Sequence, residues 1–301
     1  CTGQGGVFPN LADRMSTAAA EDIWSADANA VVATGTPTGS TALKTQRGYR
    51  LNGRWMFASG VMHATWLAAM APKVDGAGKT VGFGMFMVPK SDIELQDGWN
   101  VRGLRGTGSR QYVLKDVEVP DYRAMDGPVL RDHCGSATGL PALLLFASAF
   151  GCVGLGIARR ALDEVRHIIA EKTPYSTSRT LLDDDMVHMG LGEAEAHWGA
   201  ARAYLFELAE ACTHDYTQRG EVSGELRTHL RLAATNAMRQ AGRVVEKTYE
   251  IAGSSVIFDD HPLQRCSQDV RALTQQIQAR PAHFRTVGRV LLGLEPDNAV
   301  L

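Results

Sequence analysis

Apolar positions follow two different spacings in the two halves of this chain. Between about residue 31 and residue 119, short apolar runs such as Val81 to Val88 and Gln111 to Val119 are separated by glycine, proline, asparagine or aspartate. Short strands at regular spacing, with turn residues between them, are typical of a compact β-barrel or sandwich. We therefore predict a β-barrel middle domain over residues 29–127.

From about Leu140 onward, apolar residues recur at three- and four-residue steps, which is the spacing of amphipathic helices. The first predicted helix runs from Leu140 to Ile168, and the second begins at the aspartates 183–185, where the helix dipole favours negative charge. A third runs from Leu226 to a stop at Gly253, and a fourth from Pro262 through Ile277. Because four long helices with short connections make a bundle, we predict a C-terminal four-helix bundle over residues 128–301 and an α+β fold class.

Residues 1–28 carry a shorter helical pattern, with Leu11, Met15, Ala18 and Ile23 spaced for one face. We interpret this segment as the end of an N-terminal helical domain. Because the chain begins at Cys1 without an initiator methionine or a signal peptide pattern, we expect most of that domain to be missing from this sequence.

The composition is that of a globular protein, with 45% hydrophobic and 21% charged residues in a chain of 301. The 31 basic and 33 acidic residues give a net charge of −2, so no broad positive field attracts nucleic acid or an anionic membrane. No apolar run approaches the ~18 residues of a membrane-spanning helix without a polar interruption. We therefore expect neither a nucleic-acid partner nor a membrane partner.

The five cysteines are scattered and contain no Cys-x-x-Cys pair. An odd, dispersed set is typical of reduced thiols, so we expect a cytoplasmic protein without a disulfide framework or a zinc site. The cysteines are at positions 1, 134, 152, 212 and 266.

Three local patterns resemble functional motifs but have simpler explanations. The small residues of Gly151-x-x-Gly154-x-Gly156 lie inside a predicted helix, where they favour close helix packing over phosphate binding. Gly106-x-Gly108-Ser109 lacks the order of a nucleophile elbow. A di-iron site needs a second Glu-x-x-His beside Glu164-x-x-His167, and the sequence has none.

Several longer motifs follow one another in the order and spacing of a known family. They are Gly48–Gly60 (GYRLNGRWMFASG) with His63 and Trp66 beyond it, Gly103–Ser109, Lys115–Pro120, Gly154–Arg159, Ala252–Ser255, and Pro262–Arg265 with Asp269. Together they resemble the acyl-CoA dehydrogenase superfamily over almost the whole chain from Trp24 onward. Within it they resemble the flavin-dependent monooxygenase branch, the two-component aromatic and steroid hydroxylases. The resemblance implies a β-barrel middle domain followed by a four-helix bundle.

The resemblance also implies a role for the end of the first motif. Ser59 falls where the family places a hydroxyl hydrogen-bonded to the N5 region of the flavin, and Phe57 where an aromatic ring packs on the isoalloxazine. Gly60 beside them would allow close approach of a flat heterocycle. From the residues alone, a buried serine bonded to neighbouring backbone is the competing interpretation of Ser59. With Phe57, the tryptophans Trp66 and Trp99 are candidates for a wall that keeps water from the flavin.

Two segments of the predicted bundle are implied in flavin binding as well. Lys172-x-x-Tyr175 falls on the family's Arg-x-x-Phe segment, which reaches a flavin phosphate across a subunit interface. Lysine keeps the charge but lacks the bidentate fork, and a solvated lysine is the alternative. Gly253, Ser254 and Ser255 fall where the family brings backbone amides and hydroxyls near the cofactor, although Gly253 also fits a plain helix C-cap.

The chain departs from the dehydrogenases at the position of the catalytic base. The family's glutamate falls near Ile277, and no carboxylate occurs over residues 275–278. Abstraction of a proton from an acyl thioester needs such a base. The monooxygenase branch often has a histidine one position earlier, where this chain has Gln276. Glutamine can hydrogen-bond a substrate or an oxygen atom but cannot shuttle a proton.

The sequence therefore predicts a flavin-dependent monooxygenase, with Ser59 and Gln276 as its catalytic candidates. It would take reduced FMN or FAD from a separate flavin reductase and act on a small-molecule substrate with O2. The alternatives are an acyl-CoA dehydrogenase-like or nitroalkane-oxidising flavoenzyme with a displaced base, and a catalytically degenerate structural homologue. Because Leu143–Phe146 is apolar all round its helix, we also predict a homotetramer built through the bundle.

Overall fold

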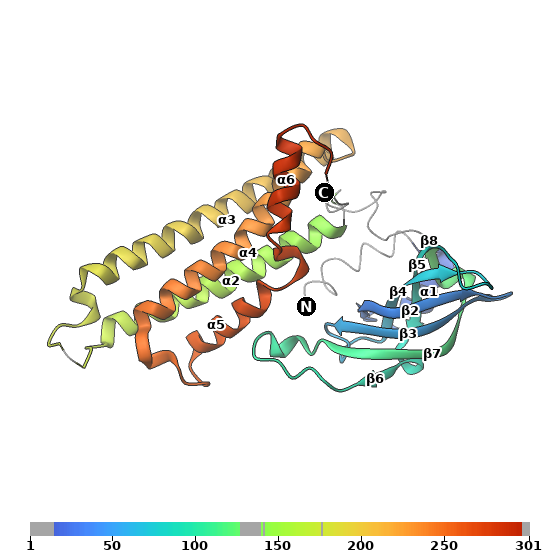
Figure 1. The fold of residues 1–301 in the computed structure, drawn as a ribbon, viewed down its shortest axis with the longest axis horizontal. Helices are drawn as coiled ribbons and strands as arrows, with labels where there is room; N and C mark the ends of the chain where they lie inside the picture. The colour runs from blue at the N-terminus through green and yellow to red at the C-terminus, as the bar shows by residue number, and fades with distance from the viewer. Residues whose placement is uncertain (1–14, 127–139, 141, 176, 297–301) are drawn as a thin grey trace. The chain divides into compact units, whose positions relative to one another are not determined.

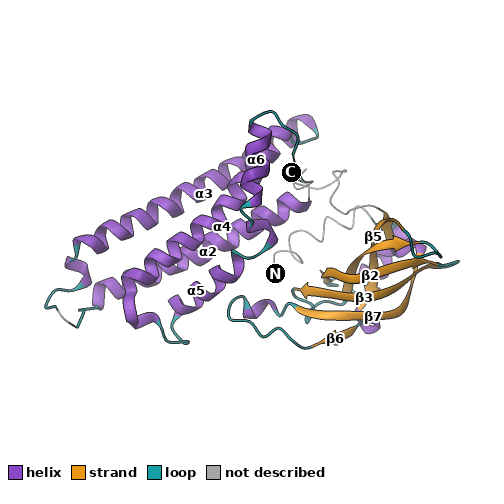
Figure 2. Ribbon diagram, viewed as in Figure 1, coloured by secondary structure: helices purple, strands orange, loops and turns teal. Residues whose placement is uncertain are grey.

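The computed structural model describes residues 15–126, 140, 142–175 and 177–296. The chain divides into two compact units, residues 1–101 with 105–137 and residues 102–104 with 138–301. The first unit holds the strands and the second holds the long helices (Figure 1, Figure 2).

The strands of the first unit form one mixed sheet with the order β6-β7-β3-β2-β4-β5-β8, and β1 pairs with β4 beside that path. Pairs β1–β4 and β2–β4 are parallel and the others are antiparallel. The strands are β1 (Val32–Thr34), β2 (Thr36–Lys44), β3 (Gly48–Ala58), β4 (Trp66–Val74), β5 (Thr80–Pro89), β6 (Glu94–Gln96), β7 (Arg110–Pro120) and β8 (Ala124–Asp126).

The described sheet is open, which corrects the closed barrel predicted from the sequence. Its two end strands, β6 and β8, have three residues each and do not pair with each other within the described part of the chain. Strands this short offer too few backbone groups to close a sheet on itself, and short edges are also a common protection against pairing with other chains.

Large side chains on alternate positions of the strands build the core of this unit. Trp55 is fully buried, stacks on Tyr112 with ring centroids 5.3 Å apart, and donates from Nε1 to the carbonyl oxygen of Met70 at 2.8 Å. Because the indole N–H has a partner, burial of this large ring carries no polar penalty. Trp55 thereby ties β3 to both β7 and β4.

Helix α1 (Thr17–Trp24) packs onto the same unit, which confirms a helix within residues 1–28; residues 1–14 of that prediction lie outside the described chain. Ser16 caps its N-terminus by accepting from the Ala19 amide at 3.1 Å. Asp22 accepts from Tyr122 Oη at 2.8 Å and from Arg123 Nε at 2.7 Å, and these two donors lower the pKa of its carboxyl group.

The second unit contains three long helices and two short ones. The long helices α2 (Ala142–Glu171), α3 (Asp185–Arg219) and α4 (Gly224–Ala252) confirm the first three predicted helices. Asp184 caps α3 by accepting from the Met186 amide at 2.8 Å, as the aspartate cluster indicated. The short helices are α5 (Pro262–Leu273) and α6 (Ala282–Leu291).

The predicted fourth long helix is wrong in its C-terminal part, so a bundle of four long helices is not confirmed. Helix α5 ends at Leu273, and the chain then forms a 3₁₀ turn over Ile277–Ala279 before α6 begins. The apolar spacing continues through Ile277, but the Gln276 side chain accepts from the Gln278 amide at 2.5 Å and starts the new turn. A side chain that bonds to nearby backbone competes with helix continuation.

Close packing of α2 against its neighbours depends on the small residues singled out in the sequence. A Cβ at Gly151 would lie 3.0 Å from Leu205 Cδ2, and one at Gly154 would lie 3.1 Å from Leu273 Cδ2. These contacts confirm that Gly151 and Gly154 serve helix packing, whereas a Cβ at Gly156 would meet no atom within 4 Å. The segment Leu143–Glu171 is long and apolar enough to cross a membrane by length and composition alone, a test that core helices of soluble proteins also pass.

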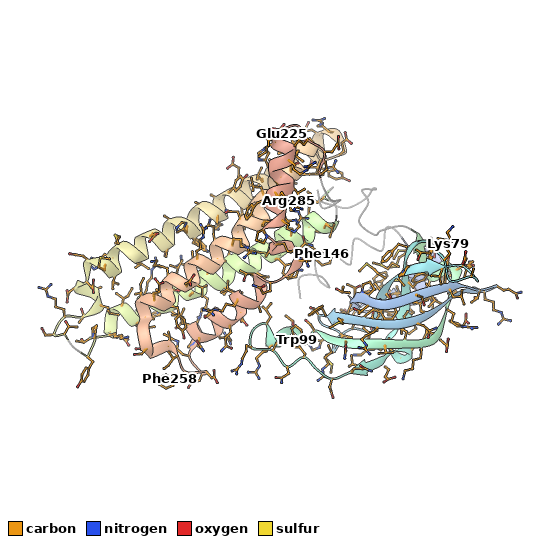
Figure 3. All side chains as sticks on the ribbon, in the orientation of Figure 1. Lys79, Trp99, Phe146, Glu225, Phe258 and Arg285 are labelled. Carbon is orange, nitrogen blue, oxygen red and sulfur yellow. The ribbon has the colours of Figure 1, made fainter. Side chains whose placement is uncertain are left out.

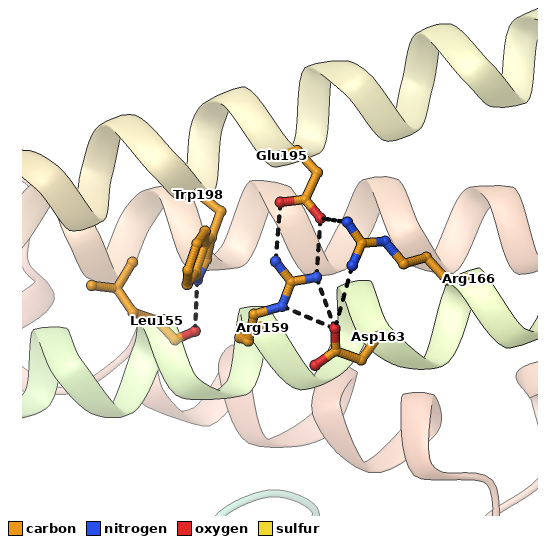
Figure 4. Close-up of polar contacts among 6 residues, drawn as sticks. All are labelled: Leu155, Arg159, Asp163, Arg166, Glu195 and Trp198. Atoms are coloured by element: carbon orange, nitrogen blue, oxygen red, sulfur yellow. Dashed lines mark hydrogen bonds and ion pairs between the residues drawn. The ribbon is translucent and has the colours of Figure 1, made fainter.

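An ion-pair network joins α2 to α3 (Figure 4). Arg159 donates to both carboxylate oxygens of Glu195, at 3.0 Å each, and its Nε donates to Asp163 at 3.1 Å. Arg166 adds a bond of 2.6 Å to Glu195. Next to it, Trp198 donates from Nε1 to the Leu155 carbonyl at 3.0 Å. The bidentate fork fixes the rotation of the two helices relative to each other.

Candidate functional site

Strand β3 contains one extra residue just before its end. Trp55 pairs with Tyr112 and Ala58 with Arg110, so three steps along β3 match two steps along β7. In a regular strand Phe57 would share the core face of Trp55. The bulge instead leaves both Met56 and Phe57 exposed and returns Ala58 to the core.

Phe57 is therefore an exposed aromatic side chain on a strained backbone. Its φ is +57°, in the left-handed region, and 58% of the residue surface is exposed. A left-handed conformation costs a residue with a Cβ about 1–2 kcal/mol. Residues with strained backbone of this kind cluster at functional sites.

A second aromatic ring stands against Phe57. Trp99, labelled in Figure 3, meets it edge to face with ring centroids 6.3 Å apart. This arrangement is one that aromatic pairs prefer, and it makes a small apolar surface. The structure gives Trp66, the other predicted wall residue, a different neighbour, because the Arg123 guanidinium lies 5.0 Å from its ring centroid.

Ser59 belongs to a chain of three hydroxyl groups. Its Oγ lies 2.6 Å from Ser109 Oγ, which lies 2.6 Å from Thr107 Oγ1. The amide of Gly60 donates to the Thr107 carbonyl at 2.9 Å and joins the end of β3 to the 3₁₀ turn Arg105–Thr107. One partner of Ser59 is thus a side-chain hydroxyl, that of Ser109.

Sequence reasoning missed Ser109 and Thr107 as neighbours of Ser59. The order of Gly106-x-Gly108-Ser109 argues against a nucleophile elbow, and no local spacing links this segment to Ser59. Each hydroxyl can rotate its O–H bond, so it can donate to one neighbour or accept from it. The three residues can therefore present either a donor or an acceptor at Ser59.

Two motifs that lie far apart in sequence meet in the helical unit. The Leu104 amide donates to Asp269 Oδ1 at 2.6 Å. A Cβ at Gly103 would lie 2.0 Å from the Gln268 carbonyl oxygen, so only glycine allows this approach. The pairing explains why Gly103-Leu104 and Asp269 occur together in one sequence pattern.

Lys172 caps the C-terminal end of α4. Its Nζ donates to the Ala252 carbonyl at 2.6 Å, where unpaired carbonyls and the negative end of the helix dipole favour a cation. Gly253 follows with φ +61° and ψ −146°, a conformation close to one that is essentially limited to glycine. Ser254, Ser255 and Tyr175 are exposed. The structure thus brings Lys172 to the Ala252–Gly253 segment.

The turn that carries Gln276 and Ile277 is held from inside by long side chains. His283 Nε2 bonds to the Ile277 carbonyl at 2.8 Å, Thr235 donates to the Gln278 carbonyl at 3.3 Å, and Arg239 donates to the Ala279 carbonyl at 2.8 Å. Arg231 donates to the side-chain oxygen of Gln278 at 2.5 Å. Every carbonyl of the turn Ile277–Ala279 therefore has a side-chain donor, while 53% of the Ile277 surface is exposed.

Two of these donors are buried basic groups. Arg231 is fully buried, and desolvation lowers its pKa to about 10, so it stays charged at neutral pH. His283 donates from Nε2, because a carbonyl only accepts, and its Nδ1 is buried without a partner among the described residues. Desolvation lowers the pKa of His283 most, the bond to Ile277 raises it, and the charges of Arg231 and Arg280 lower it further. His283 is therefore held neutral.

Comparison with known proteins shows the family of this chain. Residues 148–281 match the family described as acyl-CoA dehydrogenase, C-terminal domain. The pigment production hydroxylase of Rhodococcus erythropolis is 30% identical over 265 residues, which cover 84% of this chain and 67% of the relative. The chain belongs to the acyl-CoA dehydrogenase superfamily, in its flavin-dependent monooxygenase branch.

Other members of the superfamily agree in fold and sequence. The indole-3-acetate monooxygenase of Pseudomonas putida is 28% identical, over 83% of this chain and 64% of its own length. The structure of XiaF from a Streptomyces species, in complex with FADH2 and glycerol, has a TM-score of 0.89 and 25% identity, over 97% of this chain and 76% of that protein. The chain spans about two thirds of the length of the curated relatives it matches.

The strain at Phe57 leads to a prediction about stability. Phe57→Gly should leave the free energy of unfolding unchanged or raise it, because it relieves about 1–2 kcal/mol of strain and removes a mostly exposed ring. Phe83→Gly on β5 is the matched control, since Phe83 is also partly exposed but does not have a positive φ. The control should lose roughly 0.5–1 kcal/mol from glycine in a strand alone. Urea unfolding measures both, and equal losses would mean that Phe57 is not strained.

The neutral state of His283 leads to a prediction about pH. Because its folded pKa lies below the unfolded value of about 6.5, the unfolded chain binds the proton more readily. Stability should therefore be constant above about pH 6.5 and fall as the pH drops toward the folded pKa. His283→Gln keeps a donor for Ile277 and should flatten this fall in urea midpoints measured between about pH 7.5 and pH 5.5. The control His214→Gln replaces an exposed histidine of α3, and parallel curves for all three proteins would contradict the assignment.

Proposed function

We propose that the chain is the flavin-binding part of the oxygenase component of a two-component monooxygenase. The observation that carries the proposal is the end of β3, where strained, exposed Phe57 lies beside the hydroxyl chain that begins at Ser59. An apolar ring next to one adjustable hydroxyl fits a flat heterocycle with one polar edge. The names of the relatives, monooxygenases and hydroxylases, support this chemistry.

In this proposal Phe57 packs on the isoalloxazine, Ser59 hydrogen-bonds its N5 region, and Gly60 allows close approach. When bound, reduced flavin supplies the activation of O2 and the transfer of one oxygen atom to a small molecule. Trp99 stands against Phe57 and helps to exclude water. Ser109 and Thr107 set the direction of the Ser59 proton, because each hydroxyl can serve as donor or acceptor.

The remaining predicted residues take supporting roles. The Lys172 ammonium has three N–H donors and uses one on Ala252, so the others can reach a flavin phosphate of a neighbouring subunit. Gly253, Ser254 and Ser255 offer exposed amides and hydroxyls next to it. Gln276 uses its oxygen to cap the turn, which leaves its amide N–H groups as its contribution to a substrate. Tyr175, fully exposed, is the residue of this set with the least support.

The partners follow from the same proposal. A separate reductase supplies FADH2 or reduced FMN, since the XiaF structure holds FADH2 and a structure of the same fold, TdsC of Paenibacillus sp. A11-2, holds FMN. We place the protein in the cytoplasm as a homo-oligomer. Cys152, Cys212 and Cys266 are free thiols in the described chain, as is usual for proteins of a reducing compartment.

Rapid mixing tests the reaction class. The protein with anaerobic, pre-reduced FMN or FAD should give a transient absorbing between the reduced and oxidised forms when O2 is added. Oxidised flavin on the protein should not bleach with octanoyl-CoA, because Ile277 stands where a dehydrogenase needs its base, which contributes about 10²–10⁴-fold to rate. If octanoyl-CoA bleaches the oxidised flavin and no transient forms on addition of O2, the protein is an acyl-CoA dehydrogenase-like enzyme. If the protein binds no flavin, it is a catalytically degenerate structural homologue of these enzymes.

The role of Ser59 has its own test. Ser59→Ala should weaken reduced-flavin binding by one hydrogen bond, ~0.5–1.5 kcal/mol, or about two- to tenfold in Kd. It should also increase the peroxide released per O2 consumed. Ser91→Ala is the control, because Ser91 is exposed in the same unit and bonds only to Asp92. If Ser59→Ala matches the control in anaerobic titration and in peroxide release, Ser59 does not contact the flavin.

A further inference from the structure

The segment between β6 and β7, residues 97–109, passes from the strand unit to the helical unit and back. Near its start lies Trp99, the aromatic neighbour of Phe57. Near its end lies Thr107, the last member of the hydroxyl chain. Between them, residues 102–104 belong to the helical unit. A contact that holds these three residues therefore holds a segment with both ends in the proposed flavin site.

One acidic side chain holds the middle of this segment. The Leu104 amide donates to Asp269 Oδ1 of α5 at 2.6 Å. Hydrogen bonds to a carboxylate are stronger than those between neutral groups. The preceding residue, Gly103, lies so close to α5 that a Cβ on it would be 2.0 Å from the Gln268 carbonyl oxygen. The backbone of the segment is thus fitted directly to that of α5.

Leu104 is held in a conformation that its own backbone does not favour. Its φ is +54°, in the left-handed region that residues with a Cβ rarely adopt. Strained backbone of this kind persists only where the surrounding structure over-determines it. Here the bond to Asp269 fixes the amide, and the side chain packs against a buried cluster of the helical unit that contains Met238, Leu273 and Ala279. Without Asp269, the backbone at Leu104 can relax toward an ordinary conformation.

A short rigid turn links Leu104 to the hydroxyl chain. Residues Arg105–Thr107 form a 3₁₀ turn, which advances only about 2 Å per residue and leaves no slack. The Thr107 carbonyl accepts from the Gly60 amide at 2.9 Å, and Thr107 Oγ1 lies 2.6 Å from Ser109 Oγ, the partner of Ser59. A shift of Leu104 therefore reaches both the backbone and the side-chain contacts at the end of β3.

We propose that Asp269 is a positioning residue for the Ser59 site. By holding Leu104 in its left-handed conformation, Asp269 fixes Thr107 and thereby the direction in which the Ser59 hydroxyl points. This role rests on the flavin site proposed above, whereas the coupling between Asp269 and the end of β3 does not depend on flavin. The competing explanation is that Asp269 only stabilises α5, in which case its loss acts on the helical unit alone.

Amide hydrogen exchange without flavin tests the coupling. Asp269→Ala should speed exchange at the Gly60 amide by about tenfold or more, because one bond to a charged group is lost and the turn loosens. Asp269→Asn keeps the Oδ1 acceptor and should exchange like the wild type. Leu104→Gly relieves the strain without touching α5 and should also speed exchange at Gly60. Glu207→Ala, which removes an exposed carboxylate of α3, is the control, and amides of β5 and α3 report any global loosening.

A double-mutant cycle with reduced flavin tests whether Asp269 acts through Ser59. Asp269→Ala should raise the Kd of reduced FMN or FAD by about two- to tenfold, as Ser59→Ala does, and should release more peroxide per O2 consumed. Because both changes disturb the same hydroxyl, Ser59→Ala/Asp269→Ala should be no worse than Ser59→Ala alone. Changes at independent sites add, so multiplied fold-changes would mean that Asp269 acts only on the stability of the protein.

Each measurement can overturn the proposal by itself. Unchanged exchange at Gly60 in both Asp269→Ala and Leu104→Gly would show that the segment transmits nothing. An Asp269→Asn variant as impaired as Asp269→Ala would show that the bond to Leu104 is not what matters. Normal flavin binding and peroxide release in Asp269→Ala, beside a defective Ser59→Ala, would remove the positioning role and leave the monooxygenase intact. If Ser59→Ala has no effect either, the flavin assignment fails, and the exchange rates alone decide the coupling.

Discussion

A single extra residue in β3 decides which way the aromatic side chains at its end point. Before the bulge, Trp55 is locked into the core by its stack on Tyr112 and its bond to Met70. After it, Ala58 is buried again. Between these fixed points the backbone must place two residues outward, and Phe57 takes the left-handed conformation that this requires. The exposed ring and its neighbours Ser59 and Gly60 therefore depend on how firmly Trp55 is held.

In the helical unit too, buried hydrogen bonds fix a segment whose outer side is exposed. Buried carbonyls must be paired, and the turn Ile277–Ala279 meets this demand with side chains of α4 and α6 in place of a backbone ladder. Because Arg231 is both buried and charged, its hydrogen bond to Gln278 is costly to lose. A turn fixed in this way can expose Ile277 without becoming loose. Ile277, where the resemblance implies the base of a dehydrogenase, is an exposed apolar residue on this turn.

Charges in the helical unit are used in two ways. Between α2 and α3 they are forked and mutually paired, which orients two helices of the same protomer. On α4, Arg239 and Arg243 precede Glu246 and Glu250, and Glu250 pairs with Lys247 at 3.2 Å. Exposed ion pairs contribute little to stability one at a time. The exposed pair of α4 therefore contributes little to the stability of the protomer.

The sequence alone determined the features that depend on the local spacing of apolar and polar residues. Short strands before residue 127, three long helices after residue 140, the Asp184 cap and the stop at Gly253 all follow from spacing and end residues. The motif order also indicated the superfamily and pointed to Phe57, Ser59 and Gly60. Their assignment to a flavin remains a proposal.

Only the tertiary structure decided the features that the spacing of apolar residues does not encode. The open edges of the sheet depend on which strands find partners, and the turn that follows α5 is started by the Gln276 side chain, which accepts from the Gln278 amide. The contact of Ser59 with Ser109, and of Lys172 with Ala252, joins residues 50 and 80 positions apart. Contacts at such separation are set by how whole elements pack, because no local spacing of residues encodes them.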